Sequence, residues 1–170
     1  MNNSLTIIGA GAWGSALAIA LSHKFDKIFL LTKDKASSDA LGKQHSALSK
    51  PYNQNIFIGY SYEVISHSKA VLIATPSSAF GSVLKNIKDN VNDIPIAWVT
   101  KGFDPETANL LHETFNHYLT GHHPCVISGP TFAAEIVEEK PAAIVVASKD
   151  EKTRDYWSDI IQTETLRAYT

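Results

Sequence analysis

Hydrophobic residues in this chain gather into short runs, and the segments between the runs show helical spacing. The runs are rich in Val, Ile and Leu and do not alternate with polar residues, which is typical of strands covered by helices on both faces. They predict strands at 5–8, 28–31, 71–74, 94–99, 125–127 and 143–147, with one more short strand at 165–169.

Three segments between these runs carry one apolar stripe each and predict amphipathic helices at 13–21, 80–87 and 110–119. Ser77 or Ser78 is expected to cap the second helix, and Pro105 to stand in the first turn of the third. The polar stretch 35–60 predicts only a short helix and a loop. The alternation predicts an α/β fold, a doubly wound, Rossmann-type and mostly parallel sheet flanked by helices.

Composition narrows the class of protein. The 170 residues are 44% hydrophobic and 19% charged, which fits one globular domain over residues 1–170 and excludes a disordered chain. A net charge of -2 with scattered basic residues gives no reason to expect nucleic-acid binding. There is no apolar run of membrane-spanning length, no signal-peptide pattern and a single cysteine, Cys125. We therefore expect a cytoplasmic protein without a membrane partner.

The first turn carries the clearest chemical signal. Gly9, Gly11 and Gly14 form G-x-G-x-x-G directly after the first predicted strand and at the start of the first helix. In this pattern the first glycine makes the tight turn, the second lets a pyrophosphate approach the backbone, and the third lets helix and strand pack closely. The helix N-terminus then faces the phosphates. The context of strand, turn and helix predicts a dinucleotide-binding site.

The end of the second strand bears on which cofactor fits. A carboxylate there suits the ribose hydroxyl of NAD, whereas a cation suits the extra phosphate of NADP. Here Lys33, Asp34 and Lys35 interleave both charges. Because Lys33 stands where the strand is expected to end, NADP(H) is favoured over NAD(H). The alternative is that Lys33 and Lys35 are solvated loop charges.

Three further segments follow predicted strands: Pro76-Ser77, Thr100-Lys101-Gly102 and the run from Ser128 to Glu135. Together with the turn from Gly9 to Gly14, they closely resemble the N-terminal domain of NAD(P)-dependent glycerol-3-phosphate dehydrogenase of the bacterial biosynthetic type. The resemblance runs from Leu5 to the end of the chain. It implies hydride transfer between NAD(P)H and dihydroxyacetone phosphate to give sn-glycerol 3-phosphate for glycerophospholipid synthesis.

The resemblance also implies roles for individual residues. The cofactor contacts that it implies are Gly9, Gly11, Ala12, Trp13, Gly14, Lys33, Phe80, Lys101 and Ala133. The substrate contacts that it implies are Lys101, Gly129 and Thr131. A lysine at a strand end can also stabilise negative charge on a substrate phosphate or carbonyl oxygen. The alternative for Thr131 is a purely structural helix cap.

The reaction also needs a proton donor, which in the resembling family is a lysine of a second, helical domain. We find no counterpart here, so no catalytic residue is assigned in this chain, and we expect it to bind the cofactor with at most trace turnover. Homodimerisation is expected of the full-length protein. Two alternatives stay open: another nicotinamide reductase, such as a pyrroline-carboxylate or hydroxyacid type, or a stand-alone NAD(P)-binding sensor with no exposed apolar docking face.

Several other groups have plain structural interpretations. His122, His123 and Cys125 match no zinc spacing, so no metal is expected. The carboxylates of Glu135, Glu138 and Glu139 are expected to be solvated on a short helix. Trp157 and Tyr156 are expected in the core or at a domain interface.

Overall fold

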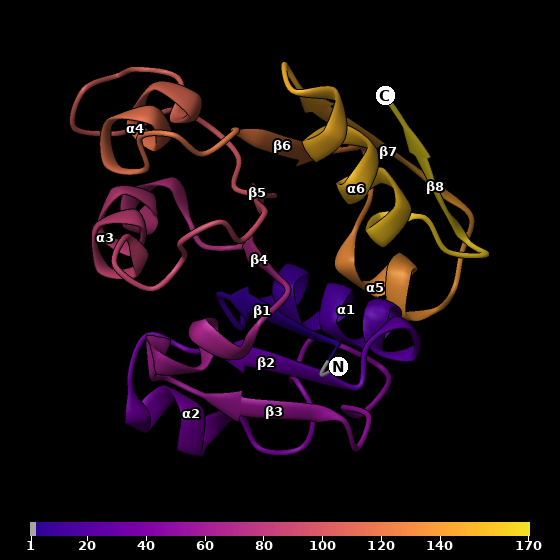
Figure 1. The fold of residues 1–170 in the computed structure, drawn as a ribbon. Coiled ribbons are helices and arrows are strands. Elements are labelled where there is room, and N and C mark those ends of the chain that lie inside the picture. The colour runs from indigo at the N-terminus through magenta and orange to yellow at the C-terminus, as the bar shows by residue number, and fades with distance from the viewer. Residues whose placement is uncertain (1–2) are drawn as a thin grey trace.

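The computed structural model describes residues 3–170, which form one eight-stranded sheet (Figure 1). The strand order is β3-β2-β1-β4-β5-β6-β7-β8. All pairings are parallel except that of β6 with β7. The strands are β1 (Ser4–Ile8), β2 (Lys27–Leu31), β3 (Ile56–Gly59), β4 (Ala70–Ile73), β5 (Ile96–Trp98), β6 (Cys125–Ser128), β7 (Ala142–Ser148) and β8 (Leu166–Tyr169).

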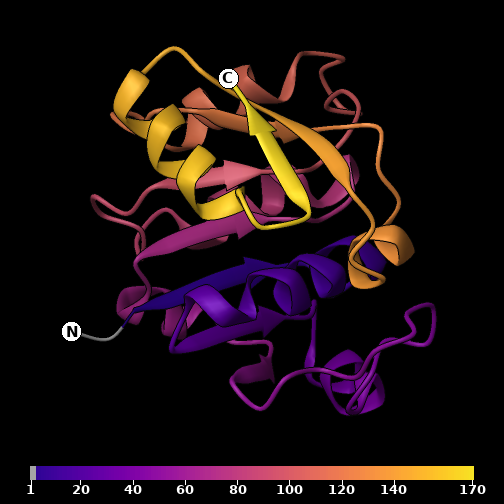
Figure 2. The same cartoon turned by 90° about the vertical axis from the view of Figure 1, so that its right-hand side faces the viewer.

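Helices cover the sheet in two layers, which Figure 1 shows on its left and right sides. One layer holds α3 and α4, and the other holds α1, α5 and α6. The helices are α1 (Ala12–Leu21), α2 (Lys35–Leu41), α3 (Ser77–Ile87), α4 (Leu111–Tyr118), α5 (Ala133–Val137) and α6 (Glu151–Ile161), with short 3-10 turns η1 (Ser22–Lys24) and η2 (Tyr62–His67). Figure 2 shows α2 at the opposite end of the molecule from the C-terminus.

The packing follows the predicted pattern of apolar runs. Every residue of β1 and of β4 is buried, because helices cover both faces of these central strands. Leu5 and Ile7 contribute to the core under α1, whereas Ile8 and Ile73 contribute to the core under α3. The predicted doubly wound sheet is therefore confirmed. No helix in residues 3–170 has the length and hydropathy of a membrane-spanning segment.

Two features of the sheet differ from the sequence prediction. The stretch expected to be a loop contains β3, a four-residue edge strand that pairs with β2. In addition, β7 runs antiparallel to β6 and is buried on one face only, since Ile144 and Val146 are buried while Val145 is 52% exposed. Its small and β-branched residues suggested a strand buried on both faces, but Ala143, Val145 and Ala147 on its second face are exposed.

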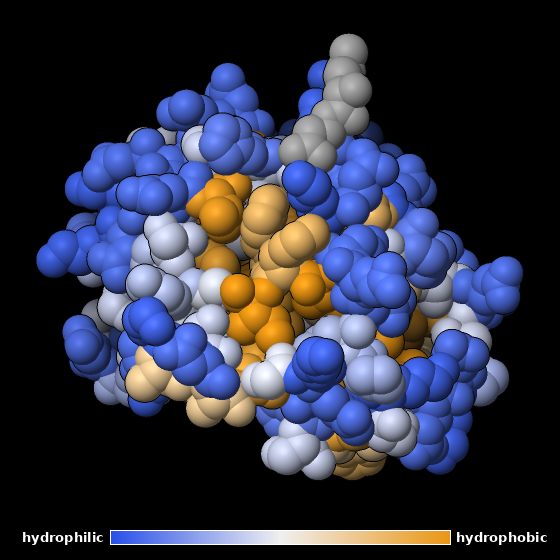
Figure 3. Space-filling model, turned by 90° about the horizontal axis from the view of Figure 1, so that it is seen from below, coloured by the Kyte–Doolittle hydropathy of each residue, from blue (hydrophilic) through white to orange (hydrophobic). Residues whose placement is uncertain are grey.

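The edge at β3 is also hydrophobic. Figure 3 views the molecule from this side of the sheet, and hydrophobic residues gather near the centre of that face. Phe57 in β3 packs against Phe29 with ring centroids 6.1 Å apart, and Lys27 Nζ lies 5.9 Å from the Phe57 ring centre. A lysine beside an edge strand disfavours pairing with other chains.

Two helix starts also differ from the prediction. Pro76 is the N-cap of α3, and neither Ser77 nor Ser78 caps it with its side chain. Pro105 lies outside α4, whose N-cap is Leu110.

Candidate dinucleotide site

The candidate site begins at the turn between β1 and α1, where the three glycines have distinct surroundings. Gly9 has a φ of +110°, and a Cβ there would lie 2.6 Å from the carbonyl oxygen of Ala74. A Cβ on Gly14 would lie 1.9 Å from the carbonyl oxygen of Gly9. A Cβ on Gly11, in contrast, would meet no atom within 4 Å. Two glycines are therefore needed for packing, and Gly11 leaves open space in front of the helix.

The start of α1 has the features of an anion-binding helix end. Gly11 is its N-cap and supplies no side chain, and the first turn holds no acidic residue. The positive end of the helix and the amides of Ala12 and Trp13 are therefore not neutralised by a side-chain carboxylate. These features fit the pyrophosphate of a dinucleotide.

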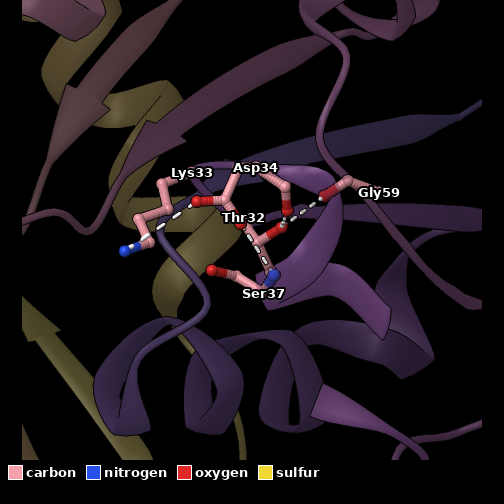
Figure 4. A network of polar contacts seen from close by, with 5 residues as sticks. All are labelled: Thr32, Lys33, Asp34, Ser37 and Gly59. Atoms are coloured by element: carbon pink, nitrogen blue, oxygen red, sulfur yellow. Dashed lines mark hydrogen bonds and ion pairs between the residues drawn. The ribbon is translucent and has the colours of Figure 1, made fainter. Parts of the chain in front are cut away.

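The end of β2 forms a polar network, which Figure 4 shows in close view. The Asp34 carboxylate caps α2 by accepting a hydrogen bond of 2.7 Å from the Ser37 amide. This contact, more than the neighbouring Lys33 charge, lowers the pKa of Asp34. Thr32 Oγ1 donates to the carbonyl oxygens of Asp34 and Gly59, which fixes the strand end against β3.

Lys33 is free to meet a ligand. Its side chain is 82% exposed, and among residues 3–170 it has one ion pair, a long one of 3.8 Å to Asp34 Oδ2. Because Asp34 uses its other oxygen to cap α2, the lysine is the more available group of the two. The sequence analysis did not predict that Asp34 would cap α2.

Lys101 joins the ends of β5 and β6 to the first turn. Its Nζ donates a 3.3 Å hydrogen bond to the carbonyl oxygen of Gly129 and lies 5.7 Å from the Trp13 ring centre. The structure therefore brings together Trp13, Lys101 and Gly129, which are far apart in the sequence. A cation over an aromatic face is held by the ring quadrupole while it stays accessible to a ligand.

The segment after β6 contradicts the alternative that Thr131 caps the following helix. Thr131 does not cap α5, whose N-cap is Phe132, with its amide donating to Glu135 Oε2 at 3.1 Å. Instead the Thr131 hydroxyl is buried without a partner. Gly129 is required for packing, because a Cβ there would lie 2.6 Å from the carbonyl oxygen of Ala143 in β7. Ala133 is the first residue of α5 and packs partly against the core.

Phe80 lies in the core under α3. Its side chain has no exposed surface and packs edge-on against Trp98, with ring centroids 5.5 Å apart. The structure therefore gives Phe80 a packing role, and its contact with the cofactor stays a prediction.

Tyr52 is a neighbour of the site that the sequence analysis missed. It comes from the segment between α2 and β3, and its hydroxyl shares a 2.8 Å hydrogen bond with Ser15 Oγ in α1. Partial burial raises the pKa of Tyr52, so the phenol stays neutral near pH 7. The signal that could have indicated this contact was an aromatic residue in a mostly polar loop.

The remaining side chains singled out from the sequence have structural surroundings. Cys125 is fully buried in β6, whereas His123 is exposed 4.0 Å from Asp150. Residues 3–170 contain no group of three or more His, Cys, Asp or Glu arranged for a metal. Trp157 is fully buried, as expected for a core residue.

The carboxylates around α5 have the expected structural surroundings. Glu135 accepts a hydrogen bond from the Phe132 amide at 3.1 Å. Glu138 and Glu139 are exposed, as predicted, and pair with Lys140 at 2.8 Å and with Lys50 at 2.7 Å. The pair with Lys50 joins the end of α5 to the loop before β3.

A parallel sheet whose first strand leads through an open glycine turn into an uncapped helix defines a Rossmann-type dinucleotide-binding domain. Residues 4–154 match the family described as the N-terminus of NAD-dependent glycerol-3-phosphate dehydrogenase. The chain therefore belongs to this family.

Individual relatives agree with this family. The glycerol-3-phosphate dehydrogenase [NAD(P)+] of Vesicomyosocius okutanii is 50% identical, and that of Ruthia magnifica is 47% identical, each over 100% of this chain and 52% of the relative. The crystal structure of glycerol-3-phosphate dehydrogenase from Coxiella burnetii matches with a TM-score of 0.91 at 28% identity, over 99% of this chain and 53% of that one. The chain thus spans about half the length of the relatives it matches.

Proposed function

We propose that this chain is the cofactor-binding part of an enzyme that interconverts dihydroxyacetone phosphate and sn-glycerol 3-phosphate. The observation that carries the proposal is the position of Lys101, which lies between Trp13 of the glycine turn and Gly129 after β6. The bound nicotinamide would supply the hydride. Lys101 would meet the substrate phosphate or the oxygen that gains negative charge as the hydride arrives.

The proposal assigns positions along the edge of the sheet. The turn at Gly11 would hold the pyrophosphate, and Lys33 would lie beside the adenosine ribose. Gly129 and Thr131 would contact the substrate, and Ala133 the cofactor near the nicotinamide. The proton donor would come from a second, helical domain like that of the resembling family, and a full-length dimer and a cytoplasmic location remain predictions.

A stand-alone sensor is the less favoured reading. It was expected to show a clean polar surface, but Val145 and Tyr169 on the uncovered face of β7 and β8 are 52% and 50% exposed. Leu110, 49% exposed, adds to the apolar surface near the end of β5. These residues support a larger protein as the setting of this domain.

The proposal is tested by calorimetric titration of the 170-residue chain with NADPH and NADH, followed by dihydroxyacetone phosphate. We expect saturable cofactor binding, and no more than a trace rate in a steady-state assay with NADPH and dihydroxyacetone phosphate. Normal turnover by this chain would refute the assignment of the proton donor to another domain. If the chain bound neither NADPH nor NADH, the proposed function itself would be refuted.

Cofactor preference gives a second test. We propose that NADPH binds more tightly than NADH, because the Lys33 ammonium is exposed while Asp34 is engaged in capping α2. Lys33→Glu is expected to weaken NADPH binding about tenfold or more, since it replaces an attractive charge by a repulsive one, and to leave NADH less affected. Lys35→Glu is a matched control, because Lys35 pairs with Asp39 on α2 at 2.8 Å. An unchanged NADPH to NADH affinity ratio in Lys33→Glu would remove Lys33 from the explanation.

A further inference from the structure

Three buried threonine hydroxyls at one edge of the sheet lack a hydrogen-bond partner. They are the Oγ1 atoms of Thr75, Thr100 and Thr131, and Trp157 Nε1 is the remaining unpartnered buried polar side-chain atom in residues 3–170. Thr100 is 7% and Thr131 is 8% exposed. Native proteins pair nearly all such groups, because an unpaired buried hydroxyl is destabilising. The hydroxyls therefore indicate a partner that the chain itself does not supply.

Thr75 and Thr100 follow the adjacent strands β4 and β5. Ile73 in β4 is paired with Trp98 in β5, and the Val99 amide donates to the Ile73 carbonyl oxygen at 2.9 Å. Each threonine comes two residues after one member of that pair, so both side chains lie on the same side of the sheet. Neighbouring strands are about 4.8 Å apart, so this register would place the two hydroxyls near each other.

Of the two threonines, Thr100 borders a cleft. Thr100, together with Lys101 and Ser128, lines a cleft of 670 Å³ whose other walls are mainly apolar, including Trp98 and Leu110. The polar residues stand at the carboxyl ends of β5 and β6, where ligands of open α/β sheets bind. A ligand that reaches Lys101 would therefore pass beside Thr100.

The strand order shows which part of a dinucleotide would lie there. With the adenosine end beside Lys33 after β2 and the pyrophosphate at Gly11 after β1, the next strands in the sheet are β4 and β5. Thr75 and Thr100 follow these two strands. A nicotinamide nucleoside carries a carboxamide and ribose hydroxyls, and a threonine hydroxyl can both donate to and accept from such groups.

We propose that the hydroxyls of Thr75 and Thr100 hydrogen-bond the nicotinamide nucleoside half of the bound cofactor. This inference rests on the proposed function, and it adds two binding residues to those that the sequence indicated. Thr131, after β6, lies one strand further along the sheet, where the substrate is placed by the proposed function.

The test uses Thr75→Val and Thr100→Val, which remove the hydroxyl and keep the shape of the side chain. Each variant is titrated by calorimetry with NADPH and with adenosine 2',5'-bisphosphate, which lacks the nicotinamide half. We expect each substitution to weaken NADPH binding about threefold to tenfold, the effect of one lost hydrogen bond, and to leave binding of the bisphosphate unchanged. Thr100→Ser, which retains the hydroxyl, is expected to bind NADPH within about twofold of the parent chain.

Thermal unfolding of the free chain distinguishes this role from a structural one. Because neither hydroxyl has a partner in the free protein, the Val variants are expected to keep or raise the unfolding midpoint. Trp157→Phe is the matched control, since it removes the other orphaned polar atom in α6, and it should leave NADPH binding unchanged.

The outcomes separate this inference from the function it rests on. NADPH binding that is unchanged in both Val variants would overturn the inference, and so would an equal loss of NADPH and bisphosphate binding. Failure of the parent chain to bind NADPH would overturn the proposed function instead.

Discussion

The glycines of the first turn allow packing and ligand binding to be separated by two single substitutions. In Gly14→Ala the new methyl carbon would stand 1.9 Å from the Gly9 carbonyl oxygen, and this obstacle is backbone that no side-chain rotation can move. Such overpacking costs about 1–3 kcal/mol, and more where the backbone must shift, while the better helix propensity of alanine returns at most about 1 kcal/mol. We expect a net loss of about 2 kcal/mol.

Gly11→Ala should behave in the opposite way. Gly11 has φ -71° and ψ -179°, a conformation open to alanine, and a Cβ there meets no protein atom within 4 Å. The free energy of unfolding should therefore change by no more than about 0.5 kcal/mol. The added methyl group would occupy the space proposed for the pyrophosphate, so NADPH affinity should fall about tenfold or more.

Both variants are compared with the parent chain by thermal unfolding and by calorimetric titration with NADPH. For a chain of this size, a loss of about 2 kcal/mol lowers the midpoint by about 4–8 °C. Gly81→Ala in α3 is the matched control, because its Cβ would make only ordinary contacts of 3.7 Å to Thr114 and 3.8 Å to Tyr118, and it should be neutral or slightly stabilising. Parent-like NADPH binding by Gly11→Ala would refute the proposed position of the pyrophosphate, and a parent-like midpoint for Gly14→Ala would refute the packing argument.

Three further predictions concern other parts of the chain. Asp150 caps α6, and hydrogen bonding to Thr153 lowers its pKa below 3.8. The stability that this carboxylate contributes is therefore present above that pH and is lost as the pH falls through the folded pKa. Asp150→Asn should show a shallower loss of melting temperature below pH 4 than the parent, and a parent-like slope would contradict this. Burial raises the pKa of Cys125 from 9.0 to about 12, which reduces the thiolate about a thousandfold at pH 8, so a disulfide reagent should label it readily only in denaturant. Trp157 is 0% exposed in α6, whereas Trp13 lies beside Lys101, so Trp13→Phe should reduce the fluorescence change on NADPH binding. An undiminished change would place the ligand elsewhere.

The central half of the fold could be predicted because its signals are local and redundant. Strands β1 and β4 are continuous apolar runs, and the glycine turn specifies both a strand end and a helix start. The β3 edge strand could not be predicted in the same way. Its Ile56–Gly59 run is only four residues long, follows a polar loop, and becomes a strand by pairing with β2. Pairing with β2 therefore determined the strand conformation of residues 56–59, whose local sequence has only a weak preference for it.

The site shows the same division between local and non-local information. The positions of Gly11 and Lys101 beyond the ends of β1 and β5 could be predicted because each comes shortly after an apolar strand. Whether Asp34 was free or engaged in a cap depended on where α2 begins, and whether Phe80 faced the ligand or the core depended on the rotation of α3. Neither is encoded in spacing alone.

Thr131 shows why an orphaned hydroxyl is informative where a motif is ambiguous. From the sequence it could cap a helix and also present its hydroxyl or backbone N–H to a ligand. The N-cap of α5 is Phe132, and the Glu135 carboxylate accepts a hydrogen bond from the Phe132 amide, so Thr131 does not cap this helix. The Thr131 hydroxyl is nevertheless buried without a partner, one strand beyond Thr100. Because buried hydroxyls are nearly always paired in native proteins, the missing partner supports the proposed contact of Thr131 with a ligand.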